Sequence, residues 1–381
     1  MRTEQLKWTS EAGWLPRLPG ELREATGVAL VFAGRHVLSN TSVLADVHDK
    51  YPGVRVFGCS TAGEICDTAV RDDSAVVTVV DFESSRIEYS LVHVNESANS
   101  FDLGKRLAQG LPLEGLVHVF VLSDGLNVNG SELVKGLAEH LPPDVSITGG
   151  LSGDGSSFEE TVVVFDGQAA PGTVGALGLY GKDLRIGFAS LGGWDPFGPE
   201  RLITRSEGNV LYELDGRSAL ELYKTYLGEH AKGLPATGLL FPLSLRTEEG
   251  ATPVVRTILG VDEAEQSMTF AGDVPTGAYA RLMKANFDRL IDGAIGAAKA
   301  CHEAVGASSP DLAILISCVG RKMVLKQRIE EEVEGVREVL GPDTTLTGFY
   351  SYGEISPFTP DAKCELHNQT MTITTISERA A

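Results

Sequence analysis

The sequence lacks the features that mark secreted, membrane-spanning or disulfide-built proteins. Its five cysteines, Cys59, Cys66, Cys301, Cys318 and Cys364, are odd in number, widely scattered and form no C-x-x-C pair. This usage is typical of free thiols in a reducing compartment. No run approaches the ~18 apolar residues that a bilayer span needs, and the N-terminus carries no apolar signal segment. We therefore expect a cytoplasmic protein that is not inserted in a membrane.

Positive charge is also scarce. The chain has 32 Lys and Arg against 52 Asp and Glu, a formal net charge of −20. Nucleic acids are held by clustered Lys and Arg, and the sequence shows no such cluster, so we expect no nucleic-acid partner. With 381 residues, 43% of them hydrophobic, the chain is long enough for two or more domains with ordinary cores.

The sequence contains an eight-residue motif, which we call the phrase, that occurs twice, near opposite ends of the chain. Residues 58–65 read GCSTAGEI and residues 348–355 read GFYSYGEI, so both fit G-x-x-[S/T]-x-G-E-I. Each follows a strand-like run that ends in glycine and then a helix-like stretch, and a looser third copy ends at 149–155 (GGLSGDG). Repetition on this scale predicts a duplicated strand–helix–strand unit that builds one site from several loops.

The periodicity along the chain indicates an α/β protein. Single strands alternating with helices predict crossover units, and paired strands predict hairpins, so we expect mixed sheets covered by helices in a layered, two-lobe architecture. The glycine-punctuated runs of residues 160–205 predict an antiparallel meander. Helical spacing of apolar residues predicts one helix over 217–227 and the longest helix over 278–305.

These landmarks resemble the FIST family, the F-box and intracellular signal transduction proteins. Residues 58–65 match the G-C-S-T-x-G-E-I segment of its N-terminal domain, and residues 149–154 match a later turn of the same domain. Residues 219–228, 254–258 and 348–355 match the opening helix, a strand and the closing segment of its C-terminal domain. Pro16, Pro19 and Gly20 would break any helix and predict a leader over 1–26. The pattern of strands and helices places the lobe boundary near 215, so we expect FIST domains over 27–215 and 216–360 and a C-terminal strand and tail over 361–381.

The resemblance also implies a function. FIST domains are similar to sensory modules of bacterial signalling proteins that bind small ligands such as amino acids, and some members are haem-binding nitric oxide sensors that regulate a histidine kinase. No catalytic residues belong to the family pattern. We therefore expect a sensor with no enzymatic activity that acts through a separate partner protein, with a histidine kinase as a candidate.

The chemistry of the repeated phrase suits a zwitterionic ligand. Glycines allow backbone N–H groups to approach a ligand closely, and hydroxyl groups beside them complete a receptor for a carboxylate. The glutamate, the seventh residue of the phrase, supplies a partner for an ammonium group. Loops at the carboxyl ends of strands are common ligand sites. The candidate ligand-binding residues are Gly58, Cys59, Ser60, Thr61, Gly63, Glu64, Asp124, Gly150, Ser152, Arg321, Tyr350, Ser351, Tyr352 and Glu354.

Other interpretations of the same residues remain open. The phrase can simply be a tight turn in which the hydroxyl caps the backbone and the glutamate accepts from a neighbouring N–H. Cys59 can be a catalytic nucleophile for amide or acyl transfer if a base lies beside it. One of the eight histidines can be an axial haem ligand, held without covalent attachment because C-x-x-C-H is absent. A scaffold without a pocket is a further alternative. We expect no resident cofactor and no metal.

Overall fold

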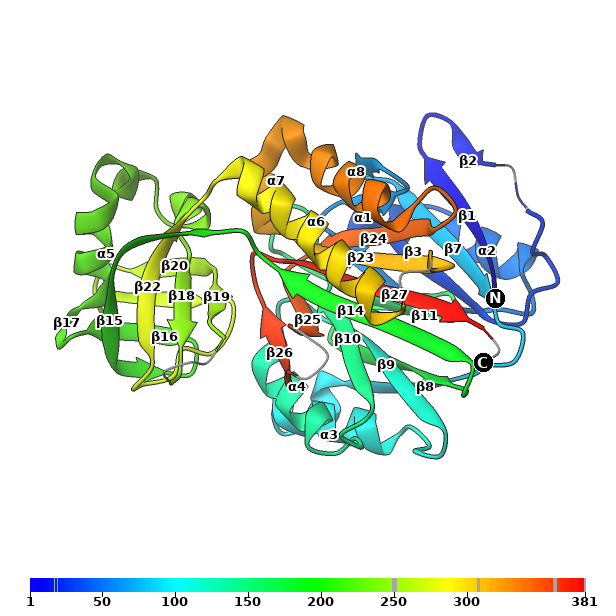
Figure 1. Ribbon diagram of the computed structural model, residues 1–381, viewed down its shortest axis with the longest axis horizontal. Coiled ribbons are helices and arrows are strands. Elements are labelled where there is room, and N and C mark those ends of the chain that lie inside the picture. Colours follow the sequence, from blue (N-terminus) through cyan, green and yellow to red (C-terminus); the bar gives the residue numbers. More distant parts are fainter. Residues whose placement is uncertain (17, 19, 249–251, 307–308, 359–361, 380–381) are drawn as a thin grey trace.

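The computed structural model describes residues 1–16, 18, 20–248, 252–306, 309–358 and 362–379. It has two parts (Figure 1): a body of three sheets covered by helices, and a small lobe that holds residues 195–284. The chain leaves the body once, at 192–195, and returns once, at 284–287. The predicted α/β class with mixed sheets in two lobes is confirmed. No helix in the described part of the chain is long and apolar enough to cross a membrane.

Each sheet of the body contains one parallel pair of neighbouring strands. The first sheet runs β12 (Gln168–Ala170), β11 (Val163–Phe165), β4 (Arg55–Thr61), β3 (Val28–Gly34), β7 (Ala75–Asp81), β1 (Arg2–Thr9) and β2 (Gly13–Leu15). The second runs β26 (Cys364–His367), β25 (Gly353–Pro357), β10 (Ser146–Leu151), β9 (Leu116–Ser123), β13 (Thr173–Tyr180) and β8 (Arg86–His93). The third runs β14 (Leu184–Leu191), β27 (Met371–Glu378), β23 (Leu312–Cys318), β24 (Thr345–Ser351), β5 (Glu64–Cys66) and β6 (Ala69–Arg71).

Helices lie on the outer faces of these sheets (Figure 1). The first sheet carries α1 (Arg35–Asn40) and α2 (Val43–Lys50), the second α3 (Ser100–Gln109) and α4 (Gly130–Ala138), and the third α6 (Phe287–Ala304), α7 (Val319–Leu325) and α8 (Ile329–Leu340). The 3-10 turns are η1 (Val94–Glu96), η2 (Gly228–Gly233), η3 (Ala236–Leu240) and η4 (Lys326–Arg328).

The small lobe is a strongly bent antiparallel sheet that packs on one helix, α5 (Ala219–Leu227). Its strands are β19 (Val254–Arg256), β18 (Leu243–Arg246), β22 (Tyr279–Lys284), β15 (Asp195–Glu207), β16 (Val210–Leu214), β21 (Ser267–Phe270) and β20 (Ile258–Asp262), with β17 (Arg217–Ser218) beside β16.

The inner faces of the three sheets meet in one shared apolar core. Every residue of β3 and of β23 is buried, as expected for parallel strands covered on both faces. Aromatic rings join the sheets at the centre: Phe32 and Phe349 lie 4.8 Å apart between centroids, and Phe57 and Phe120 lie 6.4 Å apart. This common core holds the carboxyl ends of the three parallel pairs close to one another.

The repeated phrases lie where the chain passes from one sheet to the next. At the end of the first phrase the chain enters β5, which leaves the first sheet and pairs with β24 of the third. At the end of the second phrase it enters β25, which leaves the third sheet and pairs with β10 of the second. After the looser copy, β11 leaves the second sheet and pairs with β4 of the first. The three sheets are thus tied together by the strands that follow these segments.

The leading glycine of each segment is required by close packing of a parallel pair. Gly58, Gly149 and Gly348 lie opposite Val31, Val121 and Leu315. A Cβ atom at each glycine would lie 1.8–1.9 Å from the partner's carbonyl oxygen, a backbone atom that no rotamer change can move.

Alanine at these glycines is expected to be destabilising. Gly58→Ala and Gly348→Ala should each lower the free energy of unfolding by about 1–3 kcal/mol, because the parallel strands must separate. Urea unfolding of the purified protein measures the change. Gly260→Ala is the matched control, since nothing lies within 4 Å of a Cβ at that strand position. Equal effects at Gly58 and Gly260 would contradict the argument.

Two sequence-based expectations on secondary structure are wrong. Residues 279–284 of the predicted long helix form β22, which pairs with β15 and β18, and α6 starts only after Asn286, whose side chain accepts from the amide of Arg289. Residues 160–205 do not form a meander, because β11, β13 and β14 belong to three different sheets.

The first and last strands lie in the body. Residues 2–9, part of the predicted leader, form β1 in register with β7, and β27 lies between β14 and β23 inside the third sheet. The expected domain boundary at 360 and the last residues, 380–381, lie outside the described residues.

Candidate functional site

Two cavities open where the carboxyl ends of the parallel pairs converge. The first, which we call the acidic crevice, has a volume of about 570 Å³ and is bordered by the ends of β3, β4, β10 and β23. Its charged lining consists of Arg35, His36, Glu64, Asp72, Asp73, Asp154 and Lys322. The second, the interlobe cavity, has a volume of about 280 Å³ and lies between the body and the small lobe. Val319 lines both.

Arg35 supplies one cationic group of the acidic crevice. It is the first residue of α1, directly after β3. Its guanidinium lies 4.0 Å from Asp154, 3.3 Å from Glu159 and 3.6 Å from Glu160, measured between nitrogen and carboxylate oxygen. The atom 4.0 Å from Asp154 is Nε, which is buried and makes no hydrogen bond among the described residues. A buried N–H without a hydrogen bond is uncommon, and strain, a functional role or an ordered water or ion can explain it.

Lys322 supplies the second cationic group. Its Nζ donates to the carbonyl of Ala62 at 2.8 Å, forms an ion pair with Asp72, and lies 5.6 Å from the centre of the Tyr350 ring. Gly63, with φ of +139°, lies so close that a Cβ would be 2.5 Å from this Nζ. The glycine therefore leaves room for the lysine at the first phrase.

The two glutamates of the repeated phrases are buried, and their carboxylate oxygens already accept hydrogen bonds from neighbouring residues. Glu64 accepts from the Thr61 hydroxyl through Oε1 and from the amide and hydroxyl of Ser74 through Oε2, at 3.0 and 2.6 Å. Glu354 has the same plan, accepting from the Ser351 hydroxyl at 2.6 Å and from the amide and hydroxyl of Thr370 at 3.3 and 3.0 Å. Each carboxyl group thus ties the end of one strand to the start of another.

Only one of these glutamates reaches a cavity. Glu64 lines the acidic crevice although it is 1% exposed, whereas Glu354 is fully buried and is not among the residues lining either cavity. Burial raises the pKa of Glu64 to about 7 and that of Glu354 to about 8, against the opposing effect of the donors just described.

Asp154 and Tyr352 form the wall between the two cavities. The Tyr352 hydroxyl donates to Asp154, and the Tyr352 ring stacks on Phe158 with centroids 4.5 Å apart and planes 13° apart. Burial acts to raise the pKa of Asp154, but the Tyr352 hydroxyl and three backbone amides that donate to this carboxylate hold it below its usual value. Asp154 is therefore an anion beside Arg35.

The looser third copy makes a different set of contacts. The Ser152 hydroxyl donates to the carbonyl of Ser123 at 2.8 Å. Asp124 is fully buried and accepts from the amides of Leu126, Asn127 and Gly172 at 2.7–2.8 Å. These groups shape the loops next to the interlobe cavity without lining it themselves.

The other candidate residues lie inside the body. Gly58, Cys59 and Gly150 are strand residues in the core, and the Ser60 hydroxyl accepts from the amide of Val162 at 2.9 Å. Arg321 and Tyr350 are fully buried and both contact Glu332. The structure therefore brings Thr61, Gly63 and Glu64 to the acidic crevice and Tyr352 to the interlobe cavity, while the remaining candidates line neither.

Cys59 has the surroundings of a structural thiol. It is fully buried in the shared apolar core, and burial raises the pKa of the thiol far above its usual value. A nucleophilic cysteine needs a lowered pKa and access to substrate. The geometry at Cys59 supplies neither.

Two histidines are fully buried, and they differ in their hydrogen bonds. Both ring nitrogens of His118 contact hydroxyl groups, at 2.7 and 3.0 Å, whereas His367 contacts the carbonyl of Ser356 through Nε2 at 2.7 Å and its buried Nδ1 has no partner among the described residues. His36 is the one histidine among the described residues that line the two cavities. Among the described residues, no group of three or more His, Cys, Asp or Glu side chains could hold a metal ion.

Sequence reasoning did not place Arg35, Asp72, Asp73 and Lys322 in the site. Arg35 follows the glycine at the end of a strand, as Arg321 follows Gly320, and that parallel is the signal that pointed to Arg321 instead. Because a helix turns about 100° per residue, Lys322 faces the crevice while its neighbour Arg321 faces the interior.

Comparison with known families identifies the chain. The FIST N domain matches residues 27–217 and the FIST C domain matches residues 219–357. The chain therefore belongs to the FIST family, whose domains are sensor domains of signal transduction that bind small ligands, as the sequence motifs predict.

A curated relative and a solved structure were also found. An uncharacterized protein, MJ1623 of Methanocaldococcus jannaschii, is 24% identical over 340 residues, which cover 78% of this chain and 64% of the relative. This chain thus spans less than two thirds of that relative's length. A cyanuric acid hydrolase from A. caulinodans aligns over 100% of this chain and 99% of its own, with 9% identity and a TM-score of 0.39. That score is too low to support a statement about function.

Proposed function

We propose that this FIST protein is a cytoplasmic sensor without catalytic activity, and that it binds an amino-acid-like ligand in the acidic crevice. The observation that carries the proposal is the buried Nε of Arg35, which lies 4.0 Å from Asp154 and makes no hydrogen bond among the described residues, in a side chain that lines a sizeable cavity. A ligand carboxylate would satisfy this donor and gain a charge-assisted hydrogen bond.

The other side of the crevice suits an ammonium group. Four carboxyl groups line it against the two cations Arg35 and Lys322. Lys322 is engaged with Asp72, and Asp154 lies at ion-pair distance from Arg35, whereas Asp73 is exposed at the mouth beside Gly34. A ligand with a carboxylate at Arg35 and an ammonium at Asp73 would pair both of its charges, which is the requirement for burying them.

The proposal includes output through a separate partner protein, for which a histidine kinase is the candidate that the family resemblance supplies. The alternative of a Cys59-dependent enzyme is disfavoured by the burial of that thiol. The alternative of a haem sensor is disfavoured because the two buried histidines, His118 and His367, line neither cavity. Matching registers at the three leading glycines support the interpretation of a duplicated unit.

A thermal melt with each of the twenty amino acids tests the proposal. A ligand present at ~100 times its dissociation constant adds about 2.7 kcal/mol to the free energy of unfolding. Each kcal/mol raises the melting midpoint by about 2–4 °C for a domain of about 150–250 residues. Arg35→Gln should weaken binding by roughly tenfold or more, since a hydrogen bond to a charged group contributes about 1.5–3 kcal/mol.

Matched variants separate binding from stability. Asp73→Asn should weaken binding of amino acids with a free ammonium group, whereas Arg205→Gln, in the small lobe, should leave it unchanged. Haemin is tested in the same panel, and a Soret absorption band of the protein with haemin would indicate haem binding. Amino-acid binding that survives both Arg35→Gln and Asp73→Asn would place the site elsewhere. If no amino acid shifted the melting midpoint, an amino-acid ligand would be rejected.

A further inference from the structure

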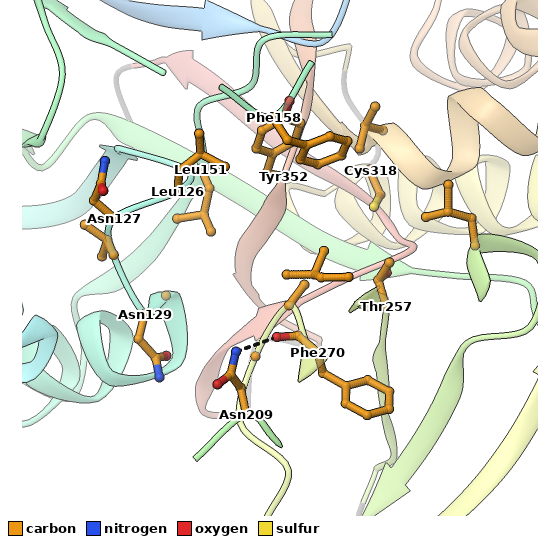
Figure 2. Close-up of a pocket in the computed structure, with 18 residues that line it drawn as sticks. Leu126, Asn127, Asn129, Leu151, Phe158, Asn209, Thr257, Phe270, Cys318 and Tyr352 are labelled. Carbon is orange, nitrogen blue, oxygen red and sulfur yellow. Dashed lines mark hydrogen bonds between the residues drawn. The ribbon is translucent and has the colours of Figure 1, made fainter. Parts of the chain in front are cut away.

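The interlobe cavity has chemistry unlike that of the acidic crevice. Figure 2 shows its residues, with Asn127, Leu151 and Tyr352 contributed by the body and Asn209, Thr257 and Phe270 by the small lobe. None of the described residues that line it is Asp, Glu, Lys, Arg or His. Its two titratable groups are the Cys318 thiol and the Tyr352 phenol, and burial raises the pKa of both far above neutrality. The cavity is therefore uncharged.

Charged residues near this cavity are already committed to other groups. Asp124 accepts three backbone amides, Asp154 accepts from Tyr352, and Asp273 pairs with Asn129 and Lys135. A charged ligand would find no partner there and would lose its hydration, a cost of several kcal/mol. A neutral ligand carries no such penalty.

Three polar atoms in the cavity remain available. Thr257 is 4% exposed, yet its hydroxyl oxygen has no hydrogen-bond partner among the described residues. The side-chain amide nitrogens of Asn127 and Asn209 donate to Asp124 and to the carbonyl of Phe270, but no described residue donates to their Oδ1 atoms. A hydroxyl without a partner can both donate to the carbonyl oxygen of a carboxamide and accept from its N–H groups.

An aromatic surface completes the cavity. Phe158 and Tyr352 stack on each other, and both line it. Phe158 is 43% exposed with φ of +54°, a backbone conformation that bulky residues rarely adopt. A flat ring packs well against such a pair, and the volume of about 280 Å³ is near the lower limit of small-ligand pockets.

We propose that the interlobe cavity is a second ligand site, for a neutral, planar, carboxamide-bearing molecule that contacts both lobes. The ring lies against Phe158 and Tyr352, and the carboxamide bonds with the Thr257 hydroxyl. Because the ligand touches both lobes, its binding restrains their relative motion, which gives the sensor a second input besides the acidic crevice.

Calorimetric titration of the full chain with two matched pairs tests the site: benzamide against benzoate, and nicotinamide against nicotinate. We expect each amide to bind at least about tenfold more tightly than its acid, a difference of about 1.4 kcal/mol. Hydrogen exchange should slow in the presence of the amide at both 125–130 and 270–272, which belong to different lobes.

Variants locate the binding. Thr257→Val should weaken amide binding about fivefold or more while folding as the parent does, because the hydroxyl makes no hydrogen bond in the free protein. Leu259→Trp, at a 49% exposed position on the rim, should fill the cavity and abolish binding. Leu113→Trp, 50% exposed outside both cavities, is the control and should bind normally.

Several results would overturn the proposal: no binding of either amide at millimolar concentration, equal binding of the acids, or binding that survives Leu259→Trp. Arg35→Gln should retain amide binding. The two sites therefore fail or succeed independently.

Discussion

Replacing Arg321 with methionine is expected to lower the free energy of unfolding by about 3–5 kcal/mol, the usual cost of removing one partner from a buried ion pair. Arg321 and Glu332 are both fully buried, with Nη2 and Nε of the arginine 2.7 and 3.1 Å from one carboxylate oxygen. The methionine variant leaves Glu332 charged in the interior with only two neutral donors, the hydroxyls of Tyr350 and Ser317.

The same substitution also removes contacts at the junction between the lobes. Arg321 donates to the carbonyl of Gly192, where the chain leaves the body, and to that of Leu290 in α6, after it returns. Urea unfolding measures the loss. Arg328→Met, which breaks a surface ion pair with Glu331 and Asp288, is the matched control and should matter far less because water screens that pair.

A second variant separates the cause from simple loss of packing. Arg321→Met combined with Glu332→Gln removes the buried charge yet keeps an amide oxygen for Tyr350, so much of the lost stability should return. The contrary result is an Arg321→Met variant that unfolds like the parent but loses ligand binding. That result would make Arg321 a ligand contact, as the sequence pattern predicted, and would contradict its structural role.

The sequence carries enough information for the parallel pairs and the family. Largely apolar runs such as 312–318 predict strands buried on both faces, and the glycine-hydroxyl-glutamate phrases mark the ends of strands in the structure. Local pattern could not show that β5, β11 and β25 each cross to a neighbouring sheet. Short strands carry no signal for their partner, and the pairing is decided by contacts far apart in the chain.

The site was harder to predict than the fold, because side-chain direction decides it. Glu64 and Glu354 occupy matching positions in their phrases, yet only Glu64 borders a cavity. The helix misassignment at 278–305 has a similar origin. The apolar residues of 279–284 suit either a helix or a strand, and pairing with β15 and β18 makes them a strand.

Stability is expected to fall by about 2 kcal/mol as the pH rises from about 6.5 to about 8, because two buried carboxyl groups must then ionise in the folded protein. Burial raises the pKa of Glu64 to about 7 and of Glu354 to about 8, whereas both lie near 4.5 in the unfolded chain. Between these values the folded state binds more protons than the unfolded state, so each group contributes stability that is lost as the pH rises through its folded pKa.

Below about pH 6.5 a second pair of groups acts in the opposite direction. Burial lowers the pKa of His118 to about 3 and that of His367 to about 4, so the unfolded chain takes up protons there that the folded protein does not. The histidines therefore offset the carboxyl groups between about pH 4.5 and 6.5, and the decline should begin only above that range.

Urea unfolding at a series of pH values, with two variants, isolates the carboxyl groups. Glu354→Gln cannot ionise and should remove most of the decline between about pH 7 and 8, whereas Glu334→Gln, exposed on α8, should leave it intact. Stability that stays level or rises between pH 6.5 and 8 in the parent would mean that both carboxyl groups are already ionised in the folded protein. Glu64 would then be negatively charged at the acidic crevice over this whole pH range. A charged Glu64 attracts an ammonium group more strongly than a protonated Glu64 does, so the crevice would favour such ligands more.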